Sequence, residues 1–223
     1  MTNSCALSWI AEQLSSLPVQ ADAALILRHA ERRDIPQGTF GMDVELTDSG
    51  VASAERLGAT LSGIRPLVGV SAGPVPRCVS TAKAILRGCG RPEEVVPDWR
   101  LGGPGPFVLD EEVSGALFLK IGILEIVKHQ LTRTEPPTGM RPTSEGINLL
   151  LGLTTNDLCS RGHLNLYVTH DSILAVLVAC LYRIRIDEIK WPGYLDGLLL
   201  WQSGDRLNFI WRGLEQGSHP LGC

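Results

Sequence analysis

The stretch ALILRHAERRD, residues Ala24 to Asp34, joins a run of apolar residues directly to a histidine that lies among cationic residues. A short, continuous apolar run is typical of a strand that is buried on both faces of a parallel sheet. Ligands on open α/β sheets bind beyond the carboxyl ends of the strands. The residues that end this predicted strand, Arg28 and His29, are therefore candidates for a binding site.

Strands and helices are predicted to alternate along the rest of the chain. Residues 46–63 have apolar positions at helical spacing, with Thr47 or Asp48 placed to cap the first turn and Gly63 to end it. The other predicted elements are a strand in 66–73, a helix in 77–90, a helix in 143–161, a strand in 164–170, a helix in 171–183 and strands in 197–203 and 206–212. This alternation predicts an α/β fold with a mostly parallel sheet and helices on both faces.

The length of the chain suits one domain with a modest insertion. With 223 residues it is long enough for a sizeable buried core. Residues 99–140 contain Gly-rich and Pro-rich turns around one predicted helix, which is typical of an excursion from the sheet. Residues 1–18 have the apolar spacing of an amphipathic helix and no cationic leader. We expect a single domain, 1–223, with a small inserted cap at about 99–140.

Composition and charge narrow the classes of partner. Hydrophobic residues make up 44% and charged residues 20% of the chain, and the net charge of -4 argues against a broad surface for nucleic acid or anionic membranes. The most apolar later segment, 115–131, contains three charged residues and is too short between them to span a bilayer. The six cysteines form no C-x-x-C pair, so free thiols are expected. These features predict a cytoplasmic protein without nucleic-acid or membrane partners, and they leave the oligomeric state open.

Three predicted strand ends carry residues that could share one crevice. The first strand ends in Arg28 and His29, Arg77 follows the second strand just inside a helix, and a later strand is followed by His170 and Asp171. Taken singly, these residues could be a solvated strand edge, an exposed helix face and a helix N-cap. Taken together, they indicate an anion site with a nucleophile and a proton carrier.

Four ordered motifs give the sequence a family resemblance. The pattern Arg-His-Gly-x-Arg appears at residues 28–32, with Ala30 where glycine is usual, so that a methyl group is expected beside the phosphate pocket. LTDSGVASAERLG at 46–58, RCVSTA at 77–82, and His170-Asp171 followed by WPGYLDGLLLW at 191–201 match further family patterns. The chain resembles the histidine phosphatase superfamily, which includes phosphoglycerate-mutase-like and acid-phosphatase-like proteins.

The resemblance implies roles for the clustered residues. His29 would be the nucleophile that carries a phosphoryl group covalently. The guanidinium groups of Arg28, Arg32 and Arg77 would bind phosphate oxygens and disfavour protonation of the imidazole. His170 would complete the phosphate site, or alternatively would be hydrogen-bonded within the strand end.

The same resemblance leaves the proton donor open. Asp171, by analogy with the acid-phosphatase branch, would protonate the leaving oxygen and then activate water. The mutase-like branch takes its proton donor from a different segment, so the rival is one of the carboxylates in the expected cap, Asp110, Glu111 or Glu112. These three acids could equally be the solvated start of a helix.

The resemblance therefore implies a metal-independent phosphatase that hydrolyses a small-molecule phosphomonoester through a phosphohistidine, without a cofactor. One alternative is a phosphoryl-group mutase. Another is a weakly catalytic binder of phosphorylated ligands or phosphoproteins, which Ala30 motivates. The remaining histidines, His129, His163 and His219, have no metal-ligand spacing. We expect specificity to lie between Trp99 and Met140, where the acids would disfavour a highly anionic substrate.

Overall fold

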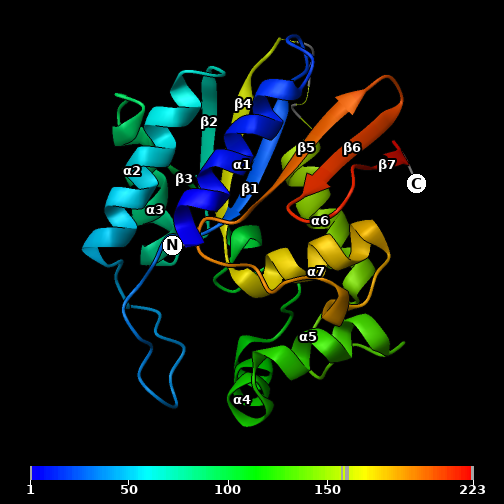
Figure 1. Ribbon diagram of the computed structural model, residues 1–223. Helices are drawn as coiled ribbons and strands as arrows, with labels where there is room; N and C mark the ends of the chain where they lie inside the picture. Colours follow the sequence, from blue (N-terminus) through cyan, green and yellow to red (C-terminus); the bar gives the residue numbers. More distant parts are fainter. Residues whose placement is uncertain (1, 157, 159–160, 222–223) are drawn as a thin grey trace.

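The computed structural model describes residues 2–156, 158 and 161–221 (Figure 1). The strands that it places in these residues are β1 (Ala23–Arg28), β2 (Leu67–Ala72), β3 (Val96–Pro97), β4 (Leu164–Thr169), β5 (Gly197–Ser203), β6 (Arg206–Trp211) and β7 (Gly217–Pro220). They form one sheet in the order β3-β2-β4-β1-β5-β6-β7. The predicted α/β fold is confirmed.

The sheet is parallel in its first half and antiparallel in its second. β1 pairs in parallel with β4, and β2 pairs in parallel with β4 and β3. β5 lies antiparallel to β1, and β6 and β7 continue this antiparallel arrangement. The short strands β3 and β7 were not predicted, because Val96–Pro97 and Gly217–Pro220 lack the apolar run or alternation that marks a strand.

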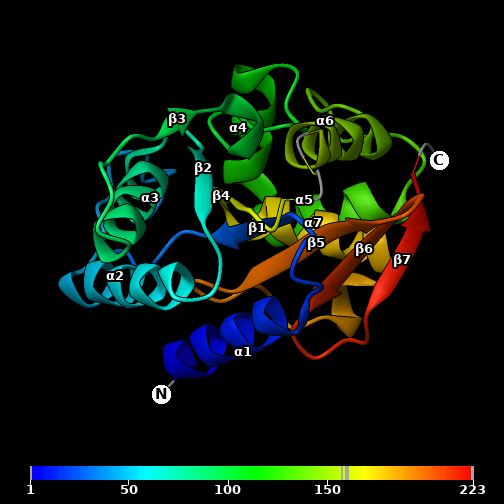
Figure 2. The same cartoon turned by 90° about the horizontal axis from the view of Figure 1, so that it is seen from above.

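Helices cover both faces of the sheet (Figure 2). On one face lie α1 (Thr2–Ser16), α2 (Asp48–Ser62) and α3 (Pro76–Gly88), and on the other α5 (Ile123–Thr132), α6 (Thr143–Thr155) and α7 (Asp171–Tyr182). Successive residues of β1 face opposite sides of the sheet. Leu25 and Leu27 belong to the hydrophobic cluster on the side of α1, α2 and α3, whereas Ala24 and Ile26 belong to the cluster on the side of α5, α6 and α7. The prediction of a central strand that is buried on both faces is confirmed.

The loop after β1 is fastened to the start of α2. Thr47 is the N-cap of α2, with its hydroxyl accepting a hydrogen bond from the Gly50 amide at 3.0 Å, and Gly63 is the C-cap, as predicted. A Cβ atom at Gly50 would overlap the carbonyl of Glu31, so only glycine permits this close approach. The contact holds the backbone just beyond His29 against the helix.

The segment between β3 and α6 contains a 3-10 turn, η1 (Trp99–Leu101), and two helices, α4 (Glu111–Ile121) and α5. The prediction of one helix here was wrong. Gly122 has φ 81 and ψ 155, outside the helical region, and it ends α4 and begins α5, although the apolar spacing continues across it. In Figure 1, α4, α5 and the loop after β1 lie at the end of the sheet where β1 and β4 finish. The division into one domain with an inserted cap stays a prediction.

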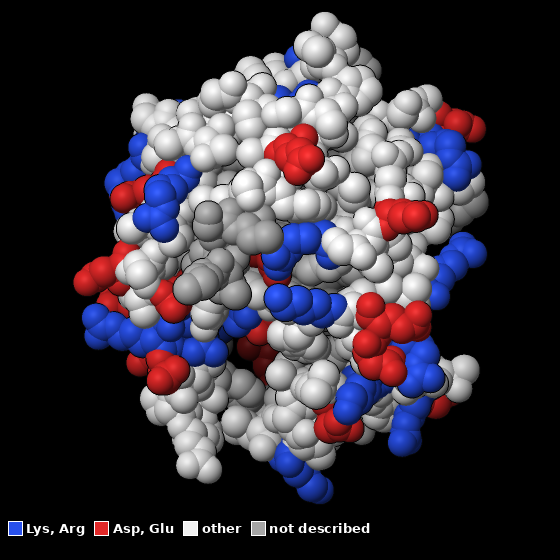
Figure 3. Space-filling view, in the orientation of Figure 1, with Lys and Arg blue, Asp and Glu red and all other residues white. Residues whose placement is uncertain are grey.

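The surface and the thiols agree with the composition. No helix among the described residues is long and apolar enough to cross a membrane. On the face of the molecule that Figure 3 shows, acidic and basic side chains are interspersed. Cys78, Cys89 and Cys180 carry free thiols, while Cys159 and Cys223 lie outside the described residues. The cytoplasmic location stays a prediction.

Candidate active site

The parallel register of β1 and β4 brings the two predicted histidines together. Arg28 is opposite Thr169 in the sheet, and the His29 amide donates to the Thr169 carbonyl at 2.9 Å. The ring centroids of His29 and His170 are 5.4 Å apart, at an interplanar angle of 72°. Strand ends that are about 140 residues apart in sequence therefore share one crevice.

His29 is held as a neutral imidazole with a defined tautomer. Its Nδ1 lies 2.8 Å from the Ala30 carbonyl oxygen, which can only accept, so Nδ1 carries the proton. Its side chain is almost completely buried, and this burial, with contributions from His170, Arg28 and Arg77, lowers the pKa of His29 to about 2. Nε2 therefore has a free lone pair at neutral pH.

Arg28 contacts both the first residue of α7 and the segment before β5. Its Nη1 donates to the Pro192 carbonyl at 2.8 Å, and its Nη2 lies 3.0 Å from Oδ2 of Asp171. The guanidinium also lies over the ring of Tyr194, 4.2 Å from the ring centroid. Its Nε is buried without a hydrogen-bond partner among the described residues.

Arg77 and Arg32 add positive charge from other elements. Arg77 lies in the first turn of α3 and donates from Nη1 to the Gly41 carbonyl at 2.6 Å, while its buried Nε has no partner among the described residues. Arg32 donates to the Arg33 carbonyl and is close enough to His170 to lower the pKa of that imidazole. The Nε–H groups of Arg28 and Arg77 are shielded from solvent, so an anion would be attracted by the positive charge of the guanidinium groups and not by these two N–H groups.

His170 follows β4 directly and precedes the first residue of α7. Its Nε2 lies 3.6 Å from the Cys78 thiol, so the described partner of the ring is on α3 and not within the strand end. Burial and the charge of Arg77 are the largest causes that lower the pKa of His170, to about 3. Gly102 packs on the ring, and a Cβ atom there would overlap it.

We expect the free energy of unfolding to decrease as the pH falls below about 6.5. His29 and His170 stay neutral in the fold because their pKa values are about 2 and about 3, whereas the unfolded chain protonates both near 6.5. Stability is therefore fully present above pH 6.5 and is lost towards pH 3, with each imidazole contributing a loss of about 2 kcal/mol between pH 7.5 and pH 5.

Urea unfolding at these two pH values tests this expectation. His29→Asn should reduce the loss by about 2 kcal/mol, since the substituted side chain does not titrate. His129→Asn is the matched control, because His129 lies on α5 and makes no described contact with His29 or His170. An equal pH dependence in the wild type and His29→Asn would contradict the assignment of a neutral, buried His29.

The four candidate carboxylates occupy different positions. Asp171 begins α7 and accepts from the Ser172 amide through Oδ1 while Oδ2 faces Arg28. Asp110 caps α4 by accepting from the amides of Glu112 and Val113, both at 3.0 Å. Glu111 lines the adjoining pocket, whereas Glu112 is exposed in the first turn of α4. Of the four carboxylates, Asp171 is thus the one that contacts Arg28. Glu111 is the one that lines the cavity next to Arg77 and His170.

Tyr194 was not predicted as a site residue. Its ring lies 5.8 Å from that of His29 and stacks on Arg28. The turn that carries it is fixed by Asp196, whose carboxylate accepts from the Gly193 amide at 2.7 Å and from Arg212 at 2.6 Å. The segment WPGYLDG was matched to a family pattern, but the sequence did not indicate that its aromatic residue would cover an arginine.

Thr81 fixes the backbone next to His29. Its hydroxyl accepts from the Ala30 amide at 2.9 Å and donates to the Arg77 carbonyl at 2.7 Å. The side chain of Ala30 is fully buried in the apolar cluster beneath α2 and α3. The methyl group of Ala30 thus packs in the core two residues after β1 ends, and its expected position beside a phosphate pocket stays a prediction.

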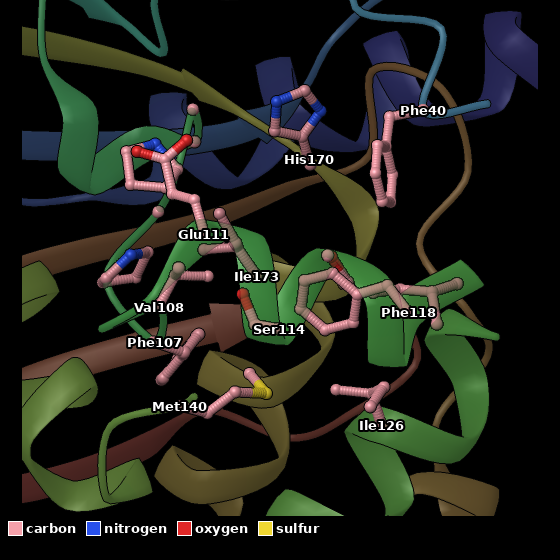
Figure 4. Close-up of a pocket in the computed structure, with 18 of the residues that line it drawn as sticks. Phe40, Phe107, Val108, Glu111, Ser114, Phe118, Ile126, Met140, His170 and Ile173 are labelled. Atoms are coloured by element: carbon pink, nitrogen blue, oxygen red, sulfur yellow. The ribbon is translucent and has the colours of Figure 1, made fainter. Parts of the chain in front are cut away.

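A cavity of about 240 Å³ adjoins the cluster at Arg77 and His170 (Figure 4). Its lining is mainly apolar and comes from the loop after β1, the segment around α4 and α5, and α7. The large apolar residues among its lining are Phe40, Met42, Phe107, Phe118, Ile126, Met140 and Ile173. Glu111, Ser114 and Gln130 are polar side chains of the same lining.

Comparisons with known proteins agree with this arrangement. The family model of the histidine phosphatase superfamily (branch 1) matches residues 24–101, which include Arg28, His29, Arg32 and Arg77 but not His170 or Asp171. A comparison with curated proteins finds none of similar sequence.

Solved structures share the fold over most of the chain. YhfR of Bacillus stearothermophilus is 18% identical, with a TM-score of 0.57 over 86% of this chain and 97% of its own. A phosphoglycerate mutase from Bacillus anthracis is 16% identical, with a TM-score of 0.57 over 86% and 91%. A mycobacterial glucosyl-3-phosphoglycerate phosphatase is 18% identical, with a TM-score of 0.54 over 81% and 90%.

The fold is thus phosphoglycerate-mutase-like, and these identities carry no more than the fold. The family match covers the strand, loop and helices that hold His29 and three of its neighbouring arginines. Together these findings confirm the resemblance of this chain to the histidine phosphatase superfamily.

Proposed function

We propose that the chain is a metal-independent phosphatase that hydrolyses a small-molecule phosphomonoester through a phosphohistidine at His29. The observation that carries the proposal is the tautomer of His29: Nδ1 donates to the Ala30 carbonyl, so Nε2 has a free lone pair within the arginine cluster. A nucleophile of this kind divides a difficult hydrolysis into two easier steps.

In the first step, the Nε2 lone pair attacks phosphorus and the ester P–O bond breaks. The leaving oxygen takes a proton from Asp171 and departs as the alcohol, which leaves a phosphoryl group bonded to Nε2. In the second step, Asp171 removes a proton from water, the resulting hydroxide oxygen attacks phosphorus, and the N–P bond breaks. Its electron pair returns to His29, and inorganic phosphate is the second product.

The surrounding residues stabilise the charge that develops. The planar guanidinium groups of Arg28 and Arg77 can each donate to phosphate oxygens. As positive charge grows on the imidazole, the Ala30 carbonyl accepts from Nδ1 more strongly, and Thr81 keeps that peptide in place. His170 would donate to a phosphate oxygen from the other side.

The charge of the cavity favours transfer of the phosphoryl group to water over its transfer to a second hydroxyl of the substrate. Among its described lining residues, Arg77 is the only arginine or lysine, and it already belongs to the phosphate site. A mutase that held a second anionic group would need further cations there. Rapid release of phosphate from p-nitrophenyl phosphate in water tests the proposal. A pure binding protein would release none, and a mutase would release little without its phosphorylated cofactor.

We expect chelators to leave the rate of hydrolysis unchanged, because arginine guanidinium groups and His170 supply the charge stabilisation that a metal ion supplies in other phosphatases. Among the described residues, no group of three or more His, Cys, Asp or Glu side chains is arranged to hold a metal ion. The measurement is kcat/KM for p-nitrophenyl phosphate before and after dialysis against EDTA. A loss of activity that a divalent cation restores would overturn this part of the proposal.

A further inference from the structure

We infer that the organic group of the substrate is apolar, larger than a single small ring, and carries a hydrogen-bond acceptor. This inference rests on the proposed function, since it places the phosphate at His29 and the ester group in the adjoining cavity. The cavity shares Arg77 and His170 with the phosphate site, so an ester bound at His29 would extend into it. Figure 4 shows His170 at one end of the lining and Ile126 and Met140 towards the other.

The inner wall of the cavity is part of the hydrophobic core. Ile126, Phe107 and Met140 are buried residues of the cluster that packs α5 and α7 on the sheet, and Ile173 of α7 belongs to it as well. Because these side chains are already fixed by the fold, they present a preformed apolar surface to a ligand.

The outer wall is apolar but exposed. Phe40 and Met42, on the loop after β1, are 40% and 50% exposed, and Phe40 meets Phe118 of α4 edge to face at 6.5 Å between ring centroids. The Arg77 guanidinium fastens this loop through the Gly41 carbonyl. An apolar ligand would remove this surface from water, and that burial would contribute favourably to binding.

The size of the cavity favours a substrate that is larger than a minimal one. Its volume is about 240 Å³. An engineered apolar protein cavity of about 150 Å³ already accommodates benzene. A branched chain or a two-ring group therefore fills this cavity better than a glycerol-sized group.

The polar side chains of the lining point to the same class of ligand. Glu111 disfavours an anionic organic group, and a sugar would leave several hydroxyls against apolar walls without partners. Gln130 lies one helical turn beyond Ile126 on α5 and is 94% buried, since its relative exposure is 6%. Its Nε2 has no hydrogen-bond partner among the described residues and is shielded from solvent, so a turn of the amide towards the cavity would let an acceptor oxygen on the ligand satisfy it.

A series of primary alkyl phosphates tests the inference, because their alcohol leaving groups are similarly basic. The esters are ethyl, butyl and hexyl phosphate, 2-(1-naphthyl)ethyl phosphate and glucose 6-phosphate. We expect kcat/KM to increase by about three- to fourfold for each added methylene, with glucose 6-phosphate no better than ethyl phosphate. Hydrolysis that is independent of chain length, or fastest with glucose 6-phosphate, would overturn the inference and leave the proposed function intact.

Two adjacent residues provide a matched pair of variants. Phe118→Ala should reduce the ratio of kcat/KM for hexyl over ethyl phosphate by about tenfold, because Phe118 lines the cavity. Leu119→Ala should leave this ratio unchanged, since Leu119 is 51% exposed and is not part of the lining. Equal ratios in the two variants would contradict the placement of the alkyl chain.

Gln130→Met tests the acceptor separately. In the wild type, 5-oxohexyl phosphate should be hydrolysed with a higher kcat/KM than hexyl phosphate, and the variant should reverse this order, because methionine offers no donor to the ketone. The same order in both proteins would refute the role of Gln130.

A binding measurement separates failure of the inference from failure of the proposed function. Alkylphosphonates cannot be hydrolysed, and calorimetry with wild-type protein should give hexylphosphonate a Kd on the order of a hundredfold lower than that of ethylphosphonate. Tighter binding of hexylphosphonate without hydrolysis of any ester would refute the phosphatase and support the apolar site. Equal binding of the two phosphonates, together with hydrolysis of the esters, would refute the apolar site and support the phosphatase.

Discussion

Replacing His29 with alanine is expected to reduce the turnover of every phosphomonoester by about 10⁴-fold or more, while the fold is retained. The Nε2 lone pair is the group that forms the bond to phosphorus in the proposed mechanism, and the guanidinium groups of the nearby Arg28 and Arg77 cannot act as nucleophiles in its place. The fold should survive because the backbone of His29 keeps its bond to the Thr169 carbonyl and the imidazole is not part of the apolar clusters.

The measurement is kcat for p-nitrophenyl phosphate, with circular dichroism to confirm folding. His129→Ala is the control, because this half-buried histidine lies on α5 and its ring contacts only the Glu135 carbonyl among the described hydrogen bonds. Wild-type protein that is quenched during turnover of radiolabelled substrate should carry acid-labile phosphate on His29. Full activity of His29→Ala would refute a phosphohistidine at this position.

The clustering of His29, Arg28, His170 and Asp171 could be predicted from sequence because it depends on strand ends. The apolar run before Arg28 and the one before His170 each mark a parallel strand, and parallel strands present their carboxyl ends at one edge. The caps of α2 at Thr47 and Gly63 were equally predictable, since they depend on local backbone chemistry.

Features that depend on packing between distant segments could not be predicted. The stacking of Tyr194 on Arg28 requires the turn that Asp196 and Arg212 hold, and the sequence does not indicate that ion pair. The break at Gly122 interrupts a helical pattern without changing its apolar spacing.

The cavity also could not be predicted from the sequence, because it depends on packing between distant segments. Its walls combine Phe40 from the loop after β1 with residues of α4, α5 and α7, and each of these residues is unremarkable in its own segment. The prediction of specificity between Trp99 and Met140 therefore stays incomplete, since it omits the contributions of Phe40 and Ile173. The acids of this segment drew attention in the sequence, but apolar side chains provide most of the surface that a ligand would meet.

Replacing Asp171 with asparagine is expected to affect alkyl and aryl phosphates very differently. An alkoxide must be protonated as the P–O bond breaks, whereas nitrophenolate leaves without a proton. General acid catalysis contributes about a hundred- to ten-thousand-fold, so Asp171→Asn should lose on the order of that factor with hexyl phosphate and less than about tenfold with p-nitrophenyl phosphate. Single-turnover rates isolate this step, because the later attack of water does not enter them.

The ion pair between Asp171 and Arg28 provides the competing explanation. Asparagine keeps an oxygen for the Ser172 amide but loses the charge that faces Arg28 at 3.0 Å. If Asp171 only positions Arg28, both substrates should lose the same factor, since both need the guanidinium on the phosphate. Glu111→Gln is the matched carboxylate variant from the cavity lining. A loss confined to hexyl phosphate in Glu111→Gln, with equal losses in Asp171→Asn, would transfer the role of acid from Asp171 to Glu111.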